Sequence, residues 1–145
     1  MATVESSVVI NRPVEEVFAY VVDPKNTAQW AGPVIEAEKT SEGPIGLGTT
    51  SKRVTQFLGR TMEGTYEIIE FEPNSYYRDK TTSGPVPMKS RISVESVKDG
   101  AKVTIEGTIE AAGFFKMAEP LISRMAKRQI ATDVQTLKDM LEAQA

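Results

Sequence analysis

Two residue types are missing from this sequence of 145 residues, which contains no cysteine and no histidine. Without cysteine the chain has no disulfide, no thiol nucleophile and no thiolate ligand for a metal. Without histidine it has no imidazole base, no serine–histidine relay and no imidazole metal ligand. Acid–base chemistry is left to Asp, Glu, Lys and Tyr, with Arg as an electrostatic stabiliser. We therefore expect no catalytic transition metal and no cofactor.

Concentrated positive charge and long apolar runs are also scarce. The net charge is −3, and Arg124, Lys127 and Arg128 form the one close basic group. We interpret that group as a solvated helix face and predict no nucleic-acid partner. No apolar stretch approaches the length of a bilayer span, and the first residues lack a basic region followed by an apolar run. We expect a soluble cytoplasmic protein without integral membrane association, either a monomer or a homodimer.

The composition is that of one globular domain covering residues 1–145. Hydrophobic residues make up 40% and charged residues 26% of the chain, which argues against disorder. The length is sufficient to bury a substantial core. No internal repeat, low-complexity segment or linker divides the sequence.

Seven runs rich in β-branched and aromatic residues, bounded by turn residues, predict strands. The turns are short and include Asp99-Gly100, which suits a tight hairpin, so consecutive strands should pair antiparallel in a meander. The predicted strands are Val4–Ile10, Val34–Thr40, Thr49–Phe57, Thr61–Phe71, Tyr76–Thr82, Met88–Val97 and Lys102–Ala111.

Helical patterns occupy only the two ends of the chain. Pro13 is typical of a helix start, Asp23-Pro24 ends that helix, and Lys25–Trp30 predicts a short second helix. A long amphipathic segment follows Pro120, with Leu137 on its apolar stripe. An α+β fold satisfies this order: one seven-stranded antiparallel sheet is wrapped round a long C-terminal helix, with two short helices after the first strand. Such an arrangement tends to enclose a cavity.

Alternation along the strands indicates which side chains face that cavity. The inward rows of three strands contain small residues, Gly64, Ser90 and Gly107, which leave room that a packed core would fill. We therefore predict a cavity between the sheet and the final helix. Its expected lining is Tyr66, Ile92, Ile105, Met125 and Gln129.

The orientation of two strands stays open at this point. Tyr76 and Arg78 share one face, Tyr77 and Asp79 share the other, and alternation does not decide which pair points inward. The strand at Thr49–Phe57 has the same ambiguity. An inward Arg78 beside a tyrosine would orient a carbonyl or carboxylate. An outward Arg78 would pair with a glutamate on a neighbouring strand.

Trp30 and Asp133 each have a structural and a functional interpretation. Trp30 can plug the core, the commoner role of such a residue, or stack over the pocket. Asp133 lies on or beside the inward face of the final helix, where a carboxylate is costly unless it is hydrogen-bonded or wet. It can therefore be a structural residue at the edge of the stripe or a residue of the site.

Short motifs are distributed along nearly the whole chain. The N-terminal part contains Pro13-x-x-x-Val17-Phe18, Asp23-Pro24 and Gln29-Trp30. The strands carry Leu47-Gly48-Thr49, Leu58-Gly59-Arg60, Phe71-Glu72-Pro73 and Ser83-Gly84-Pro85-x-Pro87. The final helix carries Asp133-Val134-x-x-Leu137-Lys138-x-x-Leu141-Glu142. In this order and spacing, the motifs resemble the START-like (SRPBCC) helix-grip superfamily, and within it the polyketide cyclase/dehydrase-like branch.

The resemblance implies the helix-grip fold and a partner that is a hydrophobic small molecule. Members bind lipids, sterols, polyketides or hormones, some cyclise or dehydrate polyketides, and some act as protein-interaction modules. Our first expectation is the binding or carrying of a lipid or polyketide-like molecule. The alternatives are a cyclase or dehydratase, with Tyr66 or Asp133 as acid–base group and Arg78 stabilising an enolate, and an interaction module using the outer sheet face. The candidate ligand-binding residues are Trp30, Tyr66, Tyr76, Arg78, Ser90, Ile92, Ile105, Met117, Leu121, Met125 and Gln129.

Overall fold

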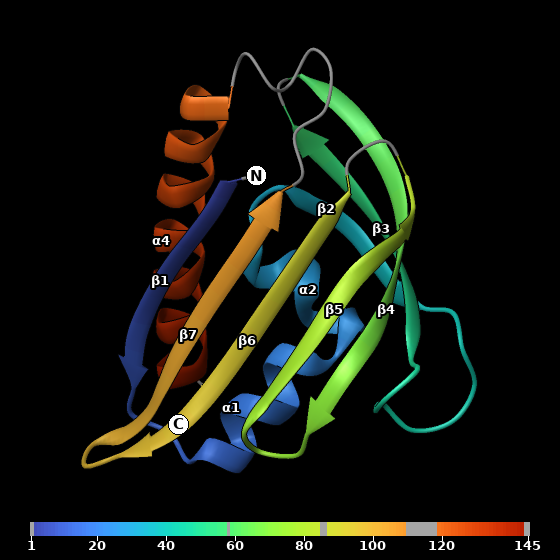
Figure 1. Cartoon of the computed structure of the whole chain (residues 1–145). Helices are drawn as coiled ribbons and strands as arrows, with labels where there is room; N and C mark the ends of the chain where they lie inside the picture. The colour runs from blue at the N-terminus through green and yellow to red at the C-terminus, as the bar shows by residue number, and fades with distance from the viewer. Residues whose placement is uncertain (1, 58, 85–86, 110–118, 144–145) are drawn as a thin grey trace.

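The computed structural model describes residues 2–57, 59–84, 87–109 and 119–143. Within these ranges a seven-stranded antiparallel sheet curls round one side of the molecule, and three helices lie on its concave side and along one edge (Figure 1). The strand order is β1-β7-β6-β5-β4-β3-β2, so β2 to β7 form a meander and β1 joins at the β7 edge. This confirms the predicted α+β helix-grip architecture. The elements are β1 (Ala2–Ile10), α1 (Val14–Val22), α2 (Pro24–Trp30), β2 (Val34–Lys39), β3 (Thr50–Phe57), β4 (Arg60–Glu72), β5 (Tyr76–Ser83), β6 (Met88–Val97), β7 (Gly100–Ile109) and α4 (Glu119–Ala143).

The two short helices begin at residues that suit a helix start. Pro13 precedes α1 in an extended conformation, with φ −62° and ψ 148°. Asp23 separates the helices and caps α2, because its carboxylate accepts a hydrogen bond from the Lys25 N–H at 3.1 Å. The buried face of α1 includes Phe18, whose ring meets Phe71 and Tyr77 edge-on, with centroids 5.6 and 6.1 Å apart. These contacts fix α1 against the concave face of the sheet.

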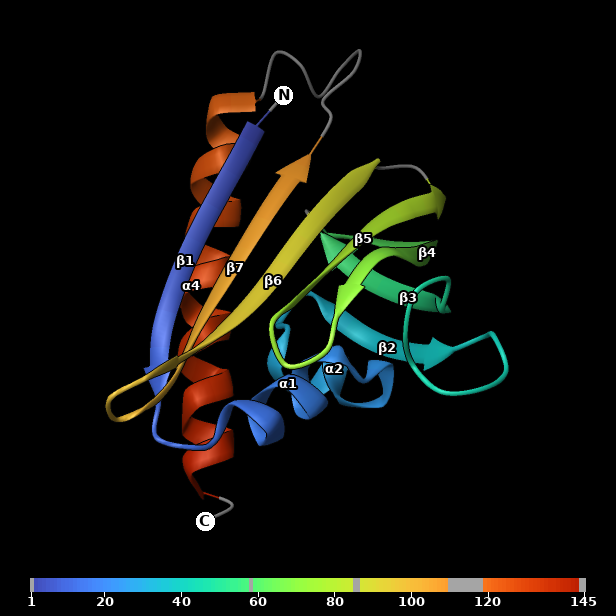
Figure 2. The ribbon, with the colours of Figure 1, turned by 60° about the horizontal axis from the view of Figure 1, so that its bottom comes forward.

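The long helix α4 covers the free edge of β1. Figures 1 and 2 both show α4 running alongside that strand. The Lys138 ammonium donates to the Val9 carbonyl at 2.7 Å, and a Glu142 carboxylate oxygen accepts from the Asn11 N–H at 2.9 Å. An uncovered strand edge offers unpaired backbone groups to other chains, so these bonds protect the sheet at this side. The opposite edge strand, β2, carries exposed Glu36 and Glu38.

The apolar core lies between the C-terminal half of α4, α1 and the nearby ends of the strands. Leu137 and Leu141 of α4 are almost fully buried there. They belong to one cluster with Val103 of β7 and Val17 of α1. Further along α4, Ile130 lies over Gly107, where a Cβ atom would stand 3.7 Å from the Ile130 Cδ1. A methyl group at Gly107 would make an ordinary contact there, so the packing of the helix does not require a glycine at this position.

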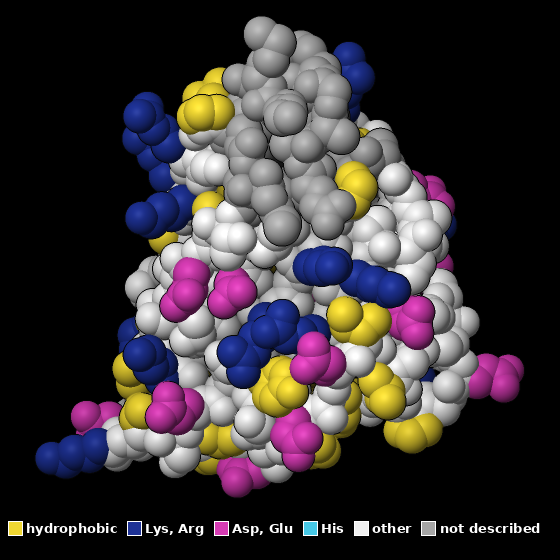
Figure 3. Space-filling view, in the orientation of Figure 1, with side chains coloured by type: hydrophobic (Ala, Val, Ile, Leu, Met, Phe, Trp, Pro, Cys, Tyr) yellow, Lys and Arg dark blue, Asp and Glu magenta, His cyan; other side chains and the backbone are white. Residues whose placement is uncertain are grey.

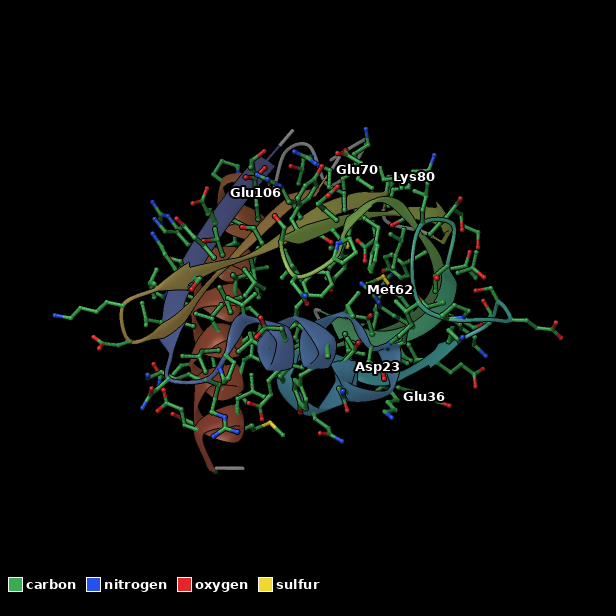
Figure 4. The ribbon with its side chains drawn as sticks, turned by 90° about the horizontal axis from the view of Figure 1, so that it is seen from below. Asp23, Glu36, Met62, Glu70, Lys80 and Glu106 are labelled. Atoms are coloured by element: carbon green, nitrogen blue, oxygen red, sulfur yellow. The ribbon has the colours of Figure 1, made fainter. Side chains whose placement is uncertain are left out.

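A β-bulge in β4 sets which residues of the central strands face inward. The β4–β5 register shifts between Ile68 and Glu70, where Ile68 pairs with Asp79 but Glu70 pairs with Arg78. Figure 4 shows Met62 enclosed by the curl of the sheet, whereas Glu70, Lys80 and Glu106 point outward. None of the helices in the described ranges has the length and apolarity needed to cross a membrane.

Leu137→Ala is expected to lower the free energy of unfolding by about 2–5 kcal/mol, because the change leaves a void among well-packed side chains. Met125→Ala on the same helix should cost much less, since Met125 is 36% exposed and Leu137 is fully buried. Chemical denaturation of both variants measures the difference. Equal losses would contradict this division of α4 into a packed half and an exposed half.

Candidate functional site

Polar side chains gather on the half of the concave sheet face that lies away from α1. On β6 the inward row changes from Val94 and Ile92 to Ser90, and on β5 it changes from Tyr77 to Asp79. Across from them, β3 contributes Arg53, which pairs with Gly64 of β4 and so shares the inward face. Apolar side chains would be the default filling here, so the polar set marks the region as a candidate site.

Arg53 and Asp79 form a buried ion pair at the centre of this region. An Arg53 terminal nitrogen lies 2.7 Å from the Asp79 Oδ2, with side-chain exposures of 22% and 5%. The second Asp79 oxygen accepts a hydrogen bond from the Ser90 hydroxyl. The Arg53 guanidinium also stacks on the Tyr66 ring, with its carbon 4.2 Å from the ring centroid. Strands β3, β4, β5 and β6 thus each supply one member of a connected cluster, which we call the inner polar cluster: Arg53, Tyr66, Asp79 and Ser90.

Two donors of the inner polar cluster have no partner among the described residues. The Arg53 Nε is buried and makes no hydrogen bond there. The Tyr66 hydroxyl makes none either, and the stacking of its ring on Arg53 is the contact that Tyr66 makes within the cluster. A buried donor without an acceptor is costly, so native proteins rarely leave one unless a water, ion or ligand serves it. Of the two donors, the Arg53 Nε is the buried one to which this cost applies.

The charge of Arg53 is maintained in spite of its burial. Burial by itself lowers the pKa of Arg53, but the charge of the Asp79 carboxylate and its hydrogen bond act in the opposite direction and the pKa is raised. The hydroxyl of the neighbouring Tyr77 donates a hydrogen bond to the Val21 carbonyl at 3.1 Å, which fixes the position of this side chain. Burial, and then the Asp79 charge, raises the pKa of Tyr77. Tyr77 therefore stays neutral and acts as a structural link between β5 and α1.

A second buried carboxyl, Asp133 of α4, connects the helix to the segment after α2. Its Oδ1 accepts from the Gly32 N–H at 3.0 Å and from the Gln129 amide at 2.8 Å. Burial raises the pKa of Asp133, although both hydrogen bonds act in the opposite direction. A Cβ at Gly32 would collide with the Gln129 amide nitrogen. Asp133 and Gln129 thus have a structural task, holding α4 against the end of α2.

A family model described as polyketide cyclase / dehydrase and lipid transport matches residues 1–142. The chain belongs to this family. No functionally curated protein matches the sequence. Among the described residues, no group of three or more Asp or Glu side chains could hold a metal ion in this member of the family.

Solved structures with the same fold cover nearly the whole chain at low identity. The protein TTHA0849 from Thermus thermophilus superimposes with a TM-score of 0.85 at 17% identity, covering 99% of both chains. A START superfamily protein from Mycobacterium smegmatis gives 0.80 at 12% identity, covering 100% of both. The Zhui aromatase/cyclase from Streptomyces sp. R1128 gives 0.76 at 16% identity, covering 97% of this chain and 93% of its own. These similarities establish the fold that this family member shares with them.

The structure places two predicted site residues on the outer face of the sheet. Arg78 pairs with Glu70 at 3.2 Å, and the Tyr76 hydroxyl donates to the same carboxylate at 3.1 Å. The Arg91 guanidinium stacks on the outer side of Tyr76, 4.6 Å from the ring centroid. The predicted place of Tyr76 and Arg78 in the cavity is therefore corrected, and the alternative in which an outward Arg78 pairs with a glutamate on a neighbouring strand is confirmed, because Tyr77 and Asp79 are the buried pair on β5.

Two predicted lining residues of α4 also lie elsewhere. Leu121 is 60% exposed and Met125 faces outward as well, so neither lines the concave side. The amphipathic stripe of α4 runs along the other flank of the helix, through Val134 and Leu137. Met117 is outside the described residues. Trp30 is buried in the core cluster, as the plug interpretation expects.

The remaining predicted residues lie on the concave side. Tyr66 and Ser90 are members of the inner polar cluster, and Ile92 and Ile105 are buried apolar neighbours on β6 and β7. Little room is left beside Gly64, because a Cβ there would lie 3.2 Å from the Ser83 carbonyl oxygen and 3.5 Å from the Tyr66 ring. The sequence left the orientation of the strands with Arg53 and Asp79 open, and neither residue was assigned to the site. The sequence did contain one signal for them. The two residues have opposite charges and lie on the two strands that flank β4, at positions where alternation allows the side chain to point inward.

Arg53→Met is expected to lower the free energy of unfolding by about 3 kcal/mol, because it leaves the Asp79 carboxylate buried without its cation. Replacing both partners, as Arg53→Met with Asp79→Leu, should recover most of that loss. Chemical denaturation of the two variants tests this. A double variant no more stable than Arg53→Met alone would show that the ion pair is not the source of the loss.

Asp133→Asn should make the protein less sensitive to pH. Because the pKa of Asp133 is raised on folding, the folded state holds this proton more tightly, and stability falls as the pH rises through the window that begins at the ordinary value of 3.8 and extends above it. The asparagine keeps an oxygen acceptor for Gly32 and does not ionise. The stability of Asp133→Asn relative to the unmodified protein should therefore increase with pH across that window. Denaturation curves at several pH values measure it, and a difference that stays constant or shrinks would refute the assignment.

Proposed function

We propose that this protein binds a hydrophobic small molecule between the concave sheet face and α4, with the polar end of the molecule at the inner polar cluster. The observation that carries the proposal is a pair of hydrogen-bond donors on an interior surface, the Arg53 Nε and the Tyr66 hydroxyl, which have no acceptor among the described residues. Buried apolar neighbours such as Ile92 and Ile105 would supply affinity, at about 25 cal/mol per Å² of apolar surface. A few placed donors would set the orientation of the ligand.

The charge of the inner polar cluster favours a neutral ligand group. Asp79 already compensates the charge of Arg53 at 2.7 Å, so a second carboxylate would meet a site without net positive charge. A carbonyl or hydroxyl oxygen needs no such charge and can accept from both free donors. We therefore favour an apolar molecule with a carbonyl or hydroxyl group over a fatty acid anion.

A second candidate function is the cyclisation or dehydration of a polyketide-like substrate. The specific observation in its favour is the contact between Arg53 and Tyr66, which places a cation beside a phenol on the interior face. Arg53 would take the role of stabilising an enolate that the sequence suggested for Arg78, and Tyr66 would be the acid–base group. Turnover of a poly-β-ketone, abolished in Tyr66→Phe, would favour this function over carrying alone.

The third option, an interaction module using the outer face of the sheet, has less support. Figure 3 shows charged side chains of both signs interspersed on that face. The cross-strand neighbours Arg78, Arg91 and Glu106 illustrate this mixture. A large contiguous apolar patch would have favoured protein docking there.

The proposal is tested by the displacement of Nile red, a neutral fluorescent probe, by a long-chain methyl ketone and by the alkane of equal length. The ketone should bind more tightly, and Tyr66→Phe should weaken its binding by about 2- to 12-fold, the value of one hydrogen bond, without affecting the alkane. Tyr76→Phe on the outer face is the matched control and should change neither.

If neither compound displaces the probe, or if Tyr76→Phe alters ketone binding as much as Tyr66→Phe, the proposed site is wrong. A fatty acid anion provides a further comparison and should bind less tightly than the ketone. Native mass spectrometry of protein purified from its own host would reveal a natural ligand directly.

A further inference from the structure

The outward side of the N-terminal half of α4 combines positive charge with exposed apolar side chains. Arg124, Lys127 and Arg128 are all exposed, and none forms an ion pair among the described residues. Leu121 and Met125 lie one turn apart on the same flank, 60% and 36% exposed. We call these five residues the basic helix face. At the upper left of the molecule, where Figure 1 places the N-terminal half of α4, Figure 3 shows dark blue and yellow side chains together without intervening magenta.

The distribution of charge along α4 is strongly asymmetric. No acidic residue occurs between Pro120 and Thr132, whereas Asp133, Asp139 and Glu142 follow in the second half. The helix dipole favours cations only in the last turn of a helix, so it does not explain why these three cations lie in the first half of α4. The protein as a whole has a net charge of −3, so the basic helix face stands out against an acidic background.

We infer that the basic helix face docks on the surface of a membrane that contains anionic lipids. A helix that lies in the interface presents Lys or Arg to the phosphate groups and inserts apolar side chains such as Leu among the acyl chains. The exposed flank of α4 has both components on one side, and its opposite side is packed on the sheet through residues such as Leu137. Binding is peripheral, with α4 lying along the surface.

A nucleic acid is the other polyanion to consider. Phosphate contacts alone would use the three cations, but they give no role to Leu121 and Met125, which remain exposed to water at an energetic cost. A bilayer surface uses all five residues. We therefore commit to the membrane and treat nucleic-acid binding as an outcome of the test.

The test measures co-sedimentation of the full chain with vesicles of phosphatidylcholine alone and with vesicles that contain about 30% phosphatidylglycerol. Each Lys or Arg near an anionic surface contributes about fivefold, so the anionic vesicles should bind roughly a hundredfold more tightly, and less so as salt is added. Arg124→Gln, Lys127→Gln and Arg128→Gln combined should abolish this preference. All three positions are exposed, and circular dichroism verifies that the variant is folded.

The matched control combines Lys80→Gln, Lys89→Gln and Lys98→Gln, which changes the net charge equally at exposed positions outside α4. It should retain most of the preference for anionic vesicles. A second pair of variants tests the apolar part, in which Leu121→Gln should weaken binding several-fold and Ile35→Gln, at a similarly exposed position on β2, should not.

Three results would overturn the inference. The first is an absence of preference for anionic vesicles in the unmodified protein at low salt. The second is an equal loss in the two triple variants, which would indicate a general charge effect. The third is binding to duplex DNA, lost in the helix triple variant, without binding to vesicles. None of these measurements depends on the interior ligand, so they leave the proposed function independently testable.

Discussion

The long helix α4 packs along β1 and β7 at one side of the curled sheet, and its C-terminal half closes the apolar core with α1 over one half of the concave face. In the C-terminal half, Leu137 and Leu141 interlock with β7 and α1 in a core with almost no exposed area. The same half reaches round the edge of β1 through Lys138 and Glu142, so it stabilises both the interior and the border of the sheet. The rest of the structure depends on this packing, because α1 and the strands have no other common partner of comparable size among the described elements.

The other half of the concave face is organised by charge and hydrogen bonding. A buried ion pair such as Arg53–Asp79 gains little stability over well-packed apolar residues, since the desolvation of both ions offsets most of their attraction. Its presence on an interior surface is therefore better explained by what it positions. Ser90 bonds to Asp79, and Asp79 in turn holds the Arg53 guanidinium over the Tyr66 ring. The apolar half of the concave face thus accounts for stability, and the polar half is the region to which we assign the proposed binding.

The helix α4 also separates its own functions by flank. One side carries the apolar stripe, Asp133 anchors the helix to Gly32, and the outward side near the N-terminal end has the cations of the basic helix face. A carrier of apolar molecules has to meet the surfaces where such molecules reside. A helix that both borders the interior and contacts an anionic bilayer would bring the binding region close to its source. The two proposals are therefore compatible, although each rests on different residues.

The fold was predictable from the sequence because its signals are local. Strand boundaries follow from turn residues and β-branched runs, and the sustained helical periodicity after Pro120 is enough to recognise α4 as a long amphipathic helix. The absence of cysteine and histidine likewise limits the chemistry through composition alone. Tyr66, Ser90, Ile92 and Ile105 were assigned to the concave side by alternation, since their strands have a clear apolar face.

The centre of the candidate site depends on contacts that no local pattern reveals. Arg53 and Asp79 stand 26 positions apart and on strands separated by β4, so only the folded sheet brings them to 2.7 Å. The inward direction of Asp79 depends on the register and on the bulge beside Glu70, which strand alternation in one sequence does not reveal. The sequence also did not show that Leu121 and Met125 point outward. The reason is similar, because the surface on which a helix packs decides which of its apolar side chains face inward. Short-range periodicity and composition were thus enough to define the elements and the excluded chemistry. Only the folded sheet determines which polar side chains contact one another, because burial and pairing depend on contacts between segments that are distant in the sequence.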